Sequence, residues 1–324
     1  MRNRKDNRLD EGQMIAKQGP DFICIGMQKA ATQWLYDQLR GHADLWMPPV
    51  KEMHFFDAGF NFRVARNKFR KFVKSKKDWG WKDQSDWGFF QHCFLTDESV
   101  FVQQAGIDLL SQKKAANIEE NYEPAAFQPT KDAVEWYRGL FDNVGGRLSG
   151  DVTPAYSTLQ QEQIETIHEA FPDTRIILLV RHPVDRVWSQ FRMRVRKGGL
   201  TERDLENKDL LVGLLNNDAK VARRSFASES YKRWSTLYRE DQIGVFFFDD
   251  IAENPREVRE RILRFIGAAG DANMGDIQPG FDRKAQQKKQ LIPAHIETAL
   301  AEHFEQEIRE IQRLFGGPSN HWDP

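Results

Sequence analysis

Cysteine is scarce in this chain: its 324 residues include only Cys24 and Cys93. Two thiols are too few for a disulfide framework, so we expect a reducing compartment and a cytoplasmic location. No apolar run reaches the roughly 20 residues that a membrane-spanning helix needs, and no membrane span is predicted. Residues 1–18 are charged and lack the apolar centre of a secretion signal, which supports the same expectation.

A strong charge of either sign is also missing, because 47 basic residues nearly balance 48 acidic ones to give a net charge of −1. A balanced chain creates no global field that would attract nucleic acid or an anionic membrane, so nucleic acid is not expected as a partner. No histidine and cysteine cluster has the spacing of metal ligands, and no metal is expected. The oligomeric state cannot be predicted from the sequence.

Apolar runs alternate with amphipathic segments along the chain. Buried strands are predicted at residues 22–25, 176–180 and 243–248, a further strand at 148–152, and a brief extended segment at 45–47. Helices are predicted at residues 30–39, 164–171, 183–197, 230–239, 254–266 and 293–315. This alternation is typical of a three-layer α/β fold, in which helices flank a central parallel sheet. We expect a flexible segment at 1–19 and a single domain over 20–324, with a variable insert at about 61–130.

The turn after the first strand has the character of an anion site. A helix that starts after a strand exposes unpaired N–H groups and the positive end of its dipole. Lys29 adds a full charge and Thr32 adds a hydroxyl. The turn lacks the Gly-Lys-Ser/Thr of a Walker A loop, which suits a ligand with no β- or γ-phosphate to wrap. By itself, however, the pattern is equally consistent with an ordinary surface turn.

A second turn with similar character follows the strand at 176–180. Arg181 comes at the carboxyl end of that strand, where ligands of open α/β sheets bind, and Ser189 lies about two helical turns further on. An arginine can hold a phosphate through two parallel charge-assisted bonds. The alternative is that Arg181 pairs with Asp185 and Ser189 faces solvent. The two turns together predict a ligand with phosphate at two separated points.

Four segments carry a resemblance to sulfotransferases that use 3′-phosphoadenosine 5′-phosphosulfate (PAPS), and they follow one another along the chain in the order of that family. Residues 29–35 resemble the 5′-phosphosulfate loop of that family, and residues 181–189 resemble its 3′-phosphate motif. Residues 51–57, Lys-Glu-Met-His-Phe-Phe-Asp, are similar to the catalytic segment of the heparan sulfate (glycan) branch. Residues 150–156 resemble the Thr-Pro-x-Tyr segment of the same branch. The resemblance covers most of the chain except residues 61–130.

The resemblance implies a P-loop-like fold and a sulfotransferase with PAPS as co-substrate, adenosine 3′,5′-bisphosphate as product and no metal. It places Lys29 near the leaving oxygen and Arg181 with Ser189 on the 3′-phosphate. The remaining residues that it assigns to the nucleotide are Gln28, Ala30, Ala31, Thr32, Gln33, Arg283 and Lys284. The family commonly has glycine at Ala30 or Ala31, and alanine fits there if the backbone is helical.

The same resemblance assigns the acceptor side to residues 51–57. Glu52 is the first candidate for general base and His54 the second, and Lys51 and Asp57 are expected to contact the acceptor. A carboxylate needs desolvation to become an effective base; the neighbours Phe55 and Phe56 could provide it, while Lys51 would oppose it. Without the resemblance, a Lys51–Glu52 surface pair and a core histidine would be the simpler interpretation.

Two other functions are compatible with the sequence. Residues 245–249 are similar to a Walker B strand, which would suit a P-loop nucleoside-triphosphate kinase or ATPase. A catalytically silent nucleotide-binding protein on the sulfotransferase scaffold is the second alternative. The acceptor stays open between a carbohydrate and another small molecule or lipid, and the insert at 61–130 is expected to shape its pocket.

Overall fold

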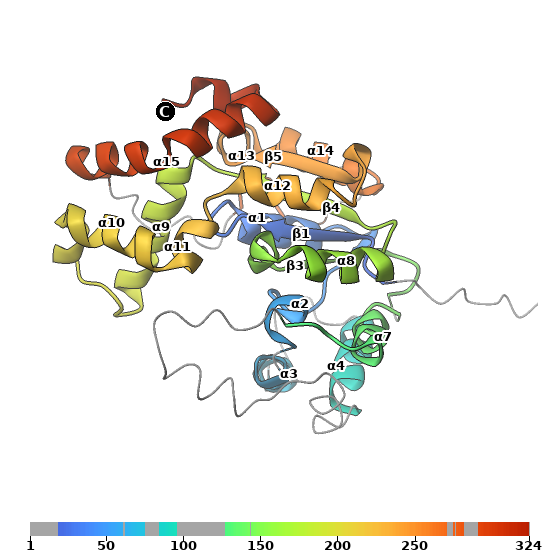
Figure 1. The fold of residues 1–324 in the computed structure, drawn as a ribbon. Coiled ribbons are helices and arrows are strands. Elements are labelled where there is room, and N and C mark those ends of the chain that lie inside the picture. The colour runs from blue at the N-terminus through green and yellow to red at the C-terminus, as the bar shows by residue number, and fades with distance from the viewer. Residues whose placement is uncertain are drawn as a thin grey trace, which may run out of the picture.

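A five-stranded sheet forms the centre of the protein, as the computed structural model shows (Figure 1). The structure describes residues 19–60, 62–74, 84–95, 127–142, 144–270, 275, 277–281 and 291–323. The strands are β1 (Phe22–Gly26), β2 (Leu45–Trp46), β3 (Leu148–Val152), β4 (Arg175–Val180) and β5 (Ile243–Phe247). Their order is β2–β3–β1–β4–β5 and every pairing is parallel, which confirms the predicted α/β fold.

The central strands are apolar because helices cover both faces of the sheet. Every residue of β1 is buried, and so is every residue of β4 after Arg175. Gly150 in β3 lies opposite Phe22 in β1. A Cβ atom at Gly150 would lie 2.3 Å from the Phe22 ring, so this glycine makes room for the aromatic side chain.

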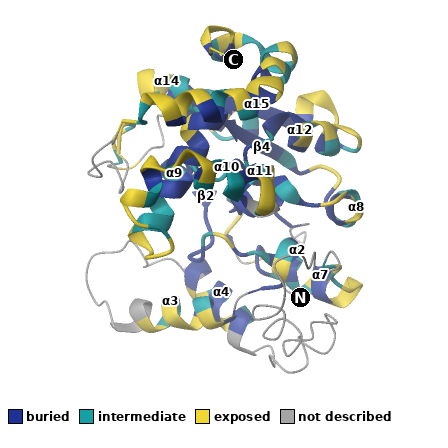
Figure 2. Cartoon of the chain, turned by 60° about the vertical axis from the view of Figure 1, so that its left-hand side comes forward, coloured by how far each residue is buried: buried dark blue, intermediate teal, exposed yellow. Residues whose placement is uncertain are grey.

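Helices form the two outer layers. Figure 1 shows α8 (Gln161–Ala170) and α12 (Ala227–Ser235) in front of the sheet and α1 (Thr32–Arg40) behind it. On the side of α1, α14 (Pro255–Ile266) contacts both α1 and β5. The long helix α15 (Ala294–Phe315) packs against α12 and against α9 (Pro183–Arg196). In Figure 2 the strands are buried and the outward faces of these helices are exposed.

Capping residues explain where several predicted helices begin and end. Asn254 accepts the N–H of Glu257 at the start of α14, and Gly267 ends that helix with a φ of 83°. Several predicted bounds were wrong, among them the start of α8, which is Gln161 rather than residue 164, and the end of α12, which is Ser235 rather than residue 239. The first helix begins at Thr32 rather than residue 30, α12 begins three residues before 230, and Phe248 opens α13 (Phe248–Glu253) instead of ending β5.

Two short helices, α10 (Lys208–Asn217) and α11 (Ala219–Arg223), had not been predicted at all. Together with α9, they lie at the left of Figure 1. The 3₁₀ turns of the described chain include η2 (Arg203–Glu206), η3 (Glu240–Gln242) and η5 (Gly317–His321). None of the helices within the described ranges is long and apolar enough to cross a membrane.

Two helices occupy the described parts of the insert predicted at about 61–130. They are α3 (Phe62–Lys74) and α4 (Gln84–Leu95), which lie with α2 (Phe55–Ala58) and α7 (Lys131–Gly139) below the sheet in Figure 1. Aromatic rings join them, with centroids 5.2 Å apart for Phe69 and Phe90. Residues 1–18 and, within the insert, residues 61, 75–83 and 96–126 lie outside the described residues.

Candidate active site

The predicted site residues of the described chain come after the carboxyl ends of β1, β2 and β4. Each lies either in the turn that follows the strand or in the next helix. The ends of parallel strands meet at one edge of the sheet, so these segments come together there. β1 connects to β2 on one side and β4 connects to β5 on the other, and β1 and β4 are neighbours. Strand connections that leave in opposite directions create the crevice in which open α/β sheets bind ligands.

The first turn, residues 27–31, has a constrained backbone. The Met27 N–H donates to the Leu179 carbonyl at 2.7 Å, which ties the turn to β4. Lys29 and Ala31 adopt left-handed conformations, with φ values of 72° and 67°. This conformation costs a non-glycine residue about 1–2 kcal/mol. The expectation of a helical backbone was therefore wrong for Ala31, which occupies a position that favours glycine.

Arg181 joins the second turn to the first. Its Nη1 donates to the Lys29 carbonyl at 3.1 Å, and its guanidinium lies 4.2 Å from the centre of the Phe248 ring. The alternative partner, Asp185, is 3.9 Å away and half exposed. Burial lowers the pKa of Arg181, and its buried Nε has no hydrogen-bond partner in the described structure. The two turns therefore lie side by side, with a buried cation between them.

Ser189 and Gln33, two other predicted nucleotide contacts, have different surroundings. Ser189 lies on α9, in the same helix that Arg181 precedes, and is half-buried. The Gln33 side-chain amide donates to Asp37 at 3.0 Å, within its own helix. Arg283 and Lys284 lie outside the described residues. The chain just before them is fixed to α1, because Trp34 donates to the Pro279 carbonyl at 2.7 Å.

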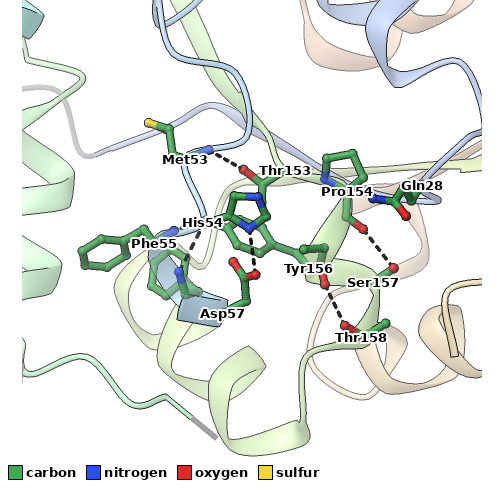
Figure 3. Close-up of polar contacts among 12 residues, drawn as sticks. Gln28, Met53, His54, Phe55, Asp57, Thr153, Pro154, Tyr156, Ser157 and Thr158 are labelled. Atoms are coloured by element: carbon green, nitrogen blue, oxygen red, sulfur yellow. Dashed lines mark hydrogen bonds and ion pairs between the residues drawn. The ribbon is translucent and has the colours of Figure 1, made fainter. Parts of the chain in front are cut away.

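The Lys51–Asp57 segment is held by the residues that follow β3. The Glu52 N–H donates to the Val152 carbonyl at 3.1 Å, and the Met53 N–H donates to Thr153 Oγ1 at 3.0 Å. The hydroxyl of Tyr156, in η1 (Pro154–Thr158), accepts the N–H groups of Phe55 at 3.1 Å and Phe56 at 3.4 Å. Figure 3 shows Met53 bonded to Thr153, with His54, Phe55 and Tyr156 beside them.

A buried carboxylate supports this arrangement from behind. Asp151 accepts hydrogen bonds from the hydroxyls of Thr153 at 2.7 Å and Tyr137 at 3.0 Å. Complete burial raises the pKa of Asp151 to about 6, although its hydroxyl partners oppose the shift. The η1 turn also packs closely on β1, since a Cβ atom at Gly26 would lie 2.8 Å from the Ser157 Cβ. The segment and the first turn therefore share one support.

Lys51 reaches from its own segment to the first turn. Its Nζ donates to Glu52 Oε1 at 2.6 Å and to Thr32 Oγ1 at 3.4 Å. The Lys51 side chain is only 11% exposed, whereas that of Glu52 is 44% exposed. Phe55 and Phe56 are wholly buried in the core, where Phe55 stacks on Tyr137 and Phe56 meets the same ring edge-on. The expectation that they desolvate Glu52 was therefore wrong.

His54 forms a pair with Asp57. Its Nδ1 lies 2.8 Å from Asp57 Oδ2, and this hydrogen bond raises the pKa of His54 against the opposing effect of burial. The other oxygen, Asp57 Oδ1, is buried and has no hydrogen-bond partner in the described structure. Glu52 and His54 are both left-handed, with φ values of 61° and 56°. Strained residues of this kind cluster at functional sites.

Arg224 is a site residue that the sequence did not reveal. Its Nη1 donates to Gln28 Oε1 at 2.9 Å, so it contacts the first turn directly. Burial lowers the pKa of Arg224, while the carboxylates of Asp57, Asp218 and Glu52 oppose the shift. No pattern in residues 200–229 indicated this position, because the contact joins residues 196 apart in the chain. Across the described ranges, no group of three or more His, Cys, Asp or Glu could hold a metal ion.

Comparisons with known proteins identify the fold and the family of this chain. The solved structure of a sulfotransferase from Alicyclobacillus acidocaldarius superimposes with a TM-score of 0.55 at 18% identity, covering 91% of this chain and 95% of that one. Heparan sulfate glucosamine 3-O-sulfotransferase 6 of Mus musculus is 36% identical over 77 residues, which are 23% of this chain and 22% of that protein. The model of the Sulfotransferase family matches residues 20–271. The chain therefore belongs to the sulfotransferase family and has its P-loop-like fold.

Proposed function

We propose that the protein transfers the sulfonate group of PAPS to a hydroxyl or amine of an acceptor and releases adenosine 3′,5′-bisphosphate. The observation that carries this proposal is the bond from Arg181 to the Lys29 carbonyl, which sets two anion-binding turns side by side. The buried Nε of Arg181, which has no hydrogen-bond partner in the described structure, fits a phosphate oxygen. Family membership favours the same chemistry over that of a nucleoside-triphosphate kinase.

The nucleotide would lie across the crevice between β1 and β4. Arg181 and Ser189 would hold its 3′-phosphate. The backbone of Ala30 and Ala31, with the side chains of Gln28, Thr32 and Gln33, would hold the 5′-phosphosulfate, and Gln33 would have to leave Asp37 to do so. Lys29 would stabilise the charge that grows on the 5′-phosphate as the bridging oxygen leaves. Arg283 and Lys284, which lie outside the described residues, are proposed as further contacts to the nucleotide.

The acceptor would bind against the Lys51–Asp57 segment, with Lys51 and Asp57 in contact with it. Glu52 would take the proton of the acceptor hydroxyl or amine as the new bond to sulfur forms. Lys51 bonds to both Glu52 and Thr32, which supports this placement of the carboxylate beside the first turn. The exposure of Glu52 means that a bound acceptor would have to displace water from it. His54 is the alternative base, since Asp57 orients its ring.

The class of acceptor is proposed from one relative. The partial match is to an enzyme named for a sugar hydroxyl, the 3-O position of glucosamine in heparan sulfate. A carbohydrate is therefore the first acceptor to test, followed by other small molecules and lipids.

Calorimetric titration with adenosine 3′,5′-bisphosphate, without magnesium, tests the nucleotide site. Arg181→Gln should weaken binding about 10- to 100-fold, since a hydrogen bond to a charged group contributes about 1.5–3 kcal/mol. Arg192→Gln is the matched control, because Arg192 lies on α9, the helix that follows Arg181, and pairs with Glu202. Equal affinities for both variants, or stabilisation of the wild type only by ATP with magnesium, would contradict the proposal.

Turnover of labelled PAPS with a panel of acceptors tests the base. Glu52→Gln should lower turnover about 10²- to 10⁴-fold and leave affinity for adenosine 3′,5′-bisphosphate unchanged. If His54→Gln shows this loss instead, the base is His54. Nucleotide binding without turnover of any acceptor would favour the catalytically silent alternative.

A further inference from the structure

Two buried polar side chains fix the backbone on both sides of Arg224. Before it, Arg186 of α9 donates through Nη2 to the Val221 carbonyl of α11 at 3.0 Å and through Nη1 to Gln190 at 2.7 Å. After it, Glu307 of α15 accepts the Ser228 N–H at 2.9 Å and the Ser228 hydroxyl at 2.5 Å. Arg186 is 1% exposed and Glu307 is 4% exposed.

Both supports are costly to bury. Burial lowers the pKa of Arg186 to about 9 and raises that of Glu307 to about 7. The charged groups that influence Arg186 and Glu307 in the described structure carry the same sign as each of them, and the Nε of Arg186 has no hydrogen-bond partner there. A fold gains little stability from such groups, and here they hold the backbone on both sides of Arg224.

The surroundings of Arg224 indicate what it contacts. It donates to Gln28, which directly precedes Lys29 in the first turn. The carboxylates of Asp57 and Glu52, in the Lys51–Asp57 segment, act against the effect of burial on the pKa of Arg224. In the proposed reaction, the group that passes between the first turn and Glu52 is the sulfonate.

We propose that Arg224 is a further catalytic residue, which binds the sulfonate oxygens during transfer; this inference rests on the proposed function. The acceptor oxygen forms a bond to sulfur while the bond from sulfur to the bridging oxygen breaks. The bridging oxygen keeps that electron pair on the 5′-phosphate beside Lys29, and the acceptor proton passes to Glu52. Arg224 holds the negative oxygens of the sulfonate from the acceptor side, in the way that arginine stabilises a transferring phosphoryl group.

Calorimetric titrations with PAPS and with adenosine 3′,5′-bisphosphate test this role, because only PAPS carries the sulfonate. Arg224→Gln should weaken PAPS binding about 10- to 100-fold, the loss expected for a hydrogen bond to a charged group, and change binding of the bisphosphate less than about twofold. Arg224→Lys keeps the charge and should recover part of the PAPS affinity. Arg223→Gln, an exposed neighbour in α11, is the matched control and should bind both ligands like the wild type.

The possible results separate the two proposals. An equal loss for both ligands, or no loss for PAPS, in a folded Arg224→Gln protein would overturn the role of Arg224 and leave the proposed function intact. A wild-type protein that binds neither ligand would overturn the proposed function and this inference with it. Thermal melting of each variant shows that it is folded.

Discussion

Removing the Tyr156 hydroxyl should both destabilise the protein and loosen the Lys51–Asp57 segment. This hydroxyl accepts the N–H groups of Phe55 and Phe56, at 3.1 Å and 3.4 Å, and the side chain is wholly buried. A buried donor that loses its partner costs about 1–3 kcal/mol. Tyr156→Phe leaves two such donors, the N–H groups of Phe55 and Phe56, without their partner. The bond to Phe56 is long and contributes less than the bond to Phe55, so we expect the variant to lower the free energy of unfolding by about 2–4 kcal/mol.

Tyr238→Phe is the matched control for this change. The Tyr238 hydroxyl is also buried, but it donates to the Phe171 carbonyl at 3.3 Å, and that carbonyl also accepts the Thr174 N–H. Its loss leaves the carbonyl paired and should cost only about 0.5–1.5 kcal/mol. Urea denaturation measures both values, and amide hydrogen exchange at Phe55 and Phe56 should accelerate only in Tyr156→Phe. Equal destabilisation of the two variants would refute the reasoning.

Three further changes have expected outcomes. Ala31→Gly should raise the free energy of unfolding by about 1 kcal/mol in urea denaturation, because glycine relieves the left-handed strain. Asp57→Asn should lower the pKa of His54 in an NMR titration, because it removes the carboxylate that raises this pKa. In the wild type, the stability that the pair contributes is complete below 6.5, the pKa of His54 in the unfolded chain. It is lost as pH rises through the higher pKa of His54 in the folded protein. Burial raises the pKa of Glu307 from 4.5 to about 7, so the folded protein binds a proton that the unfolded chain releases between these pH values. The wild type should therefore lose up to about 3 kcal/mol of stability as pH rises from 4.5 to about 7. Glu307→Gln cannot ionise and should flatten that part of the plot of stability against pH.

The strands could be predicted because burial on both faces leaves a strong mark on composition. The apolar run at 176–180 has no polar residue that would place it elsewhere, and it forms β4. Proline and glycine defined helix bounds in the same local way, as Pro255 and Gly267 do for α14. The order of the strands in the sheet depends on contacts between distant residues, and the sequence held no local sign of it.

The site was only partly predictable for a similar reason. Lys29 and Arg181 stood out because each follows a strong strand, and the structure brings them into contact. The left-handed backbone at Ala31 could not be read from an alanine, which is a helix former by preference. Arg224 was missed because a single arginine in a charged stretch has no distinguishing pattern, and only the packing of α11 brings it to Gln28.

The position of β1 in the sheet has a consequence for synthesis of the chain. Phe22 pairs with Gly150 and Arg175, so β1 acquires its two neighbouring strands only after about 130–150 further residues have been made. At about 5–20 residues per second, this delay lasts on the order of 6 to 30 s. Throughout that time four wholly apolar residues, Phe22–Ile25, have no partner strand on the ribosome. The nascent chain is therefore expected to depend on chaperones more than its charge-balanced composition suggests, and to fold slowly when it is diluted from denaturant.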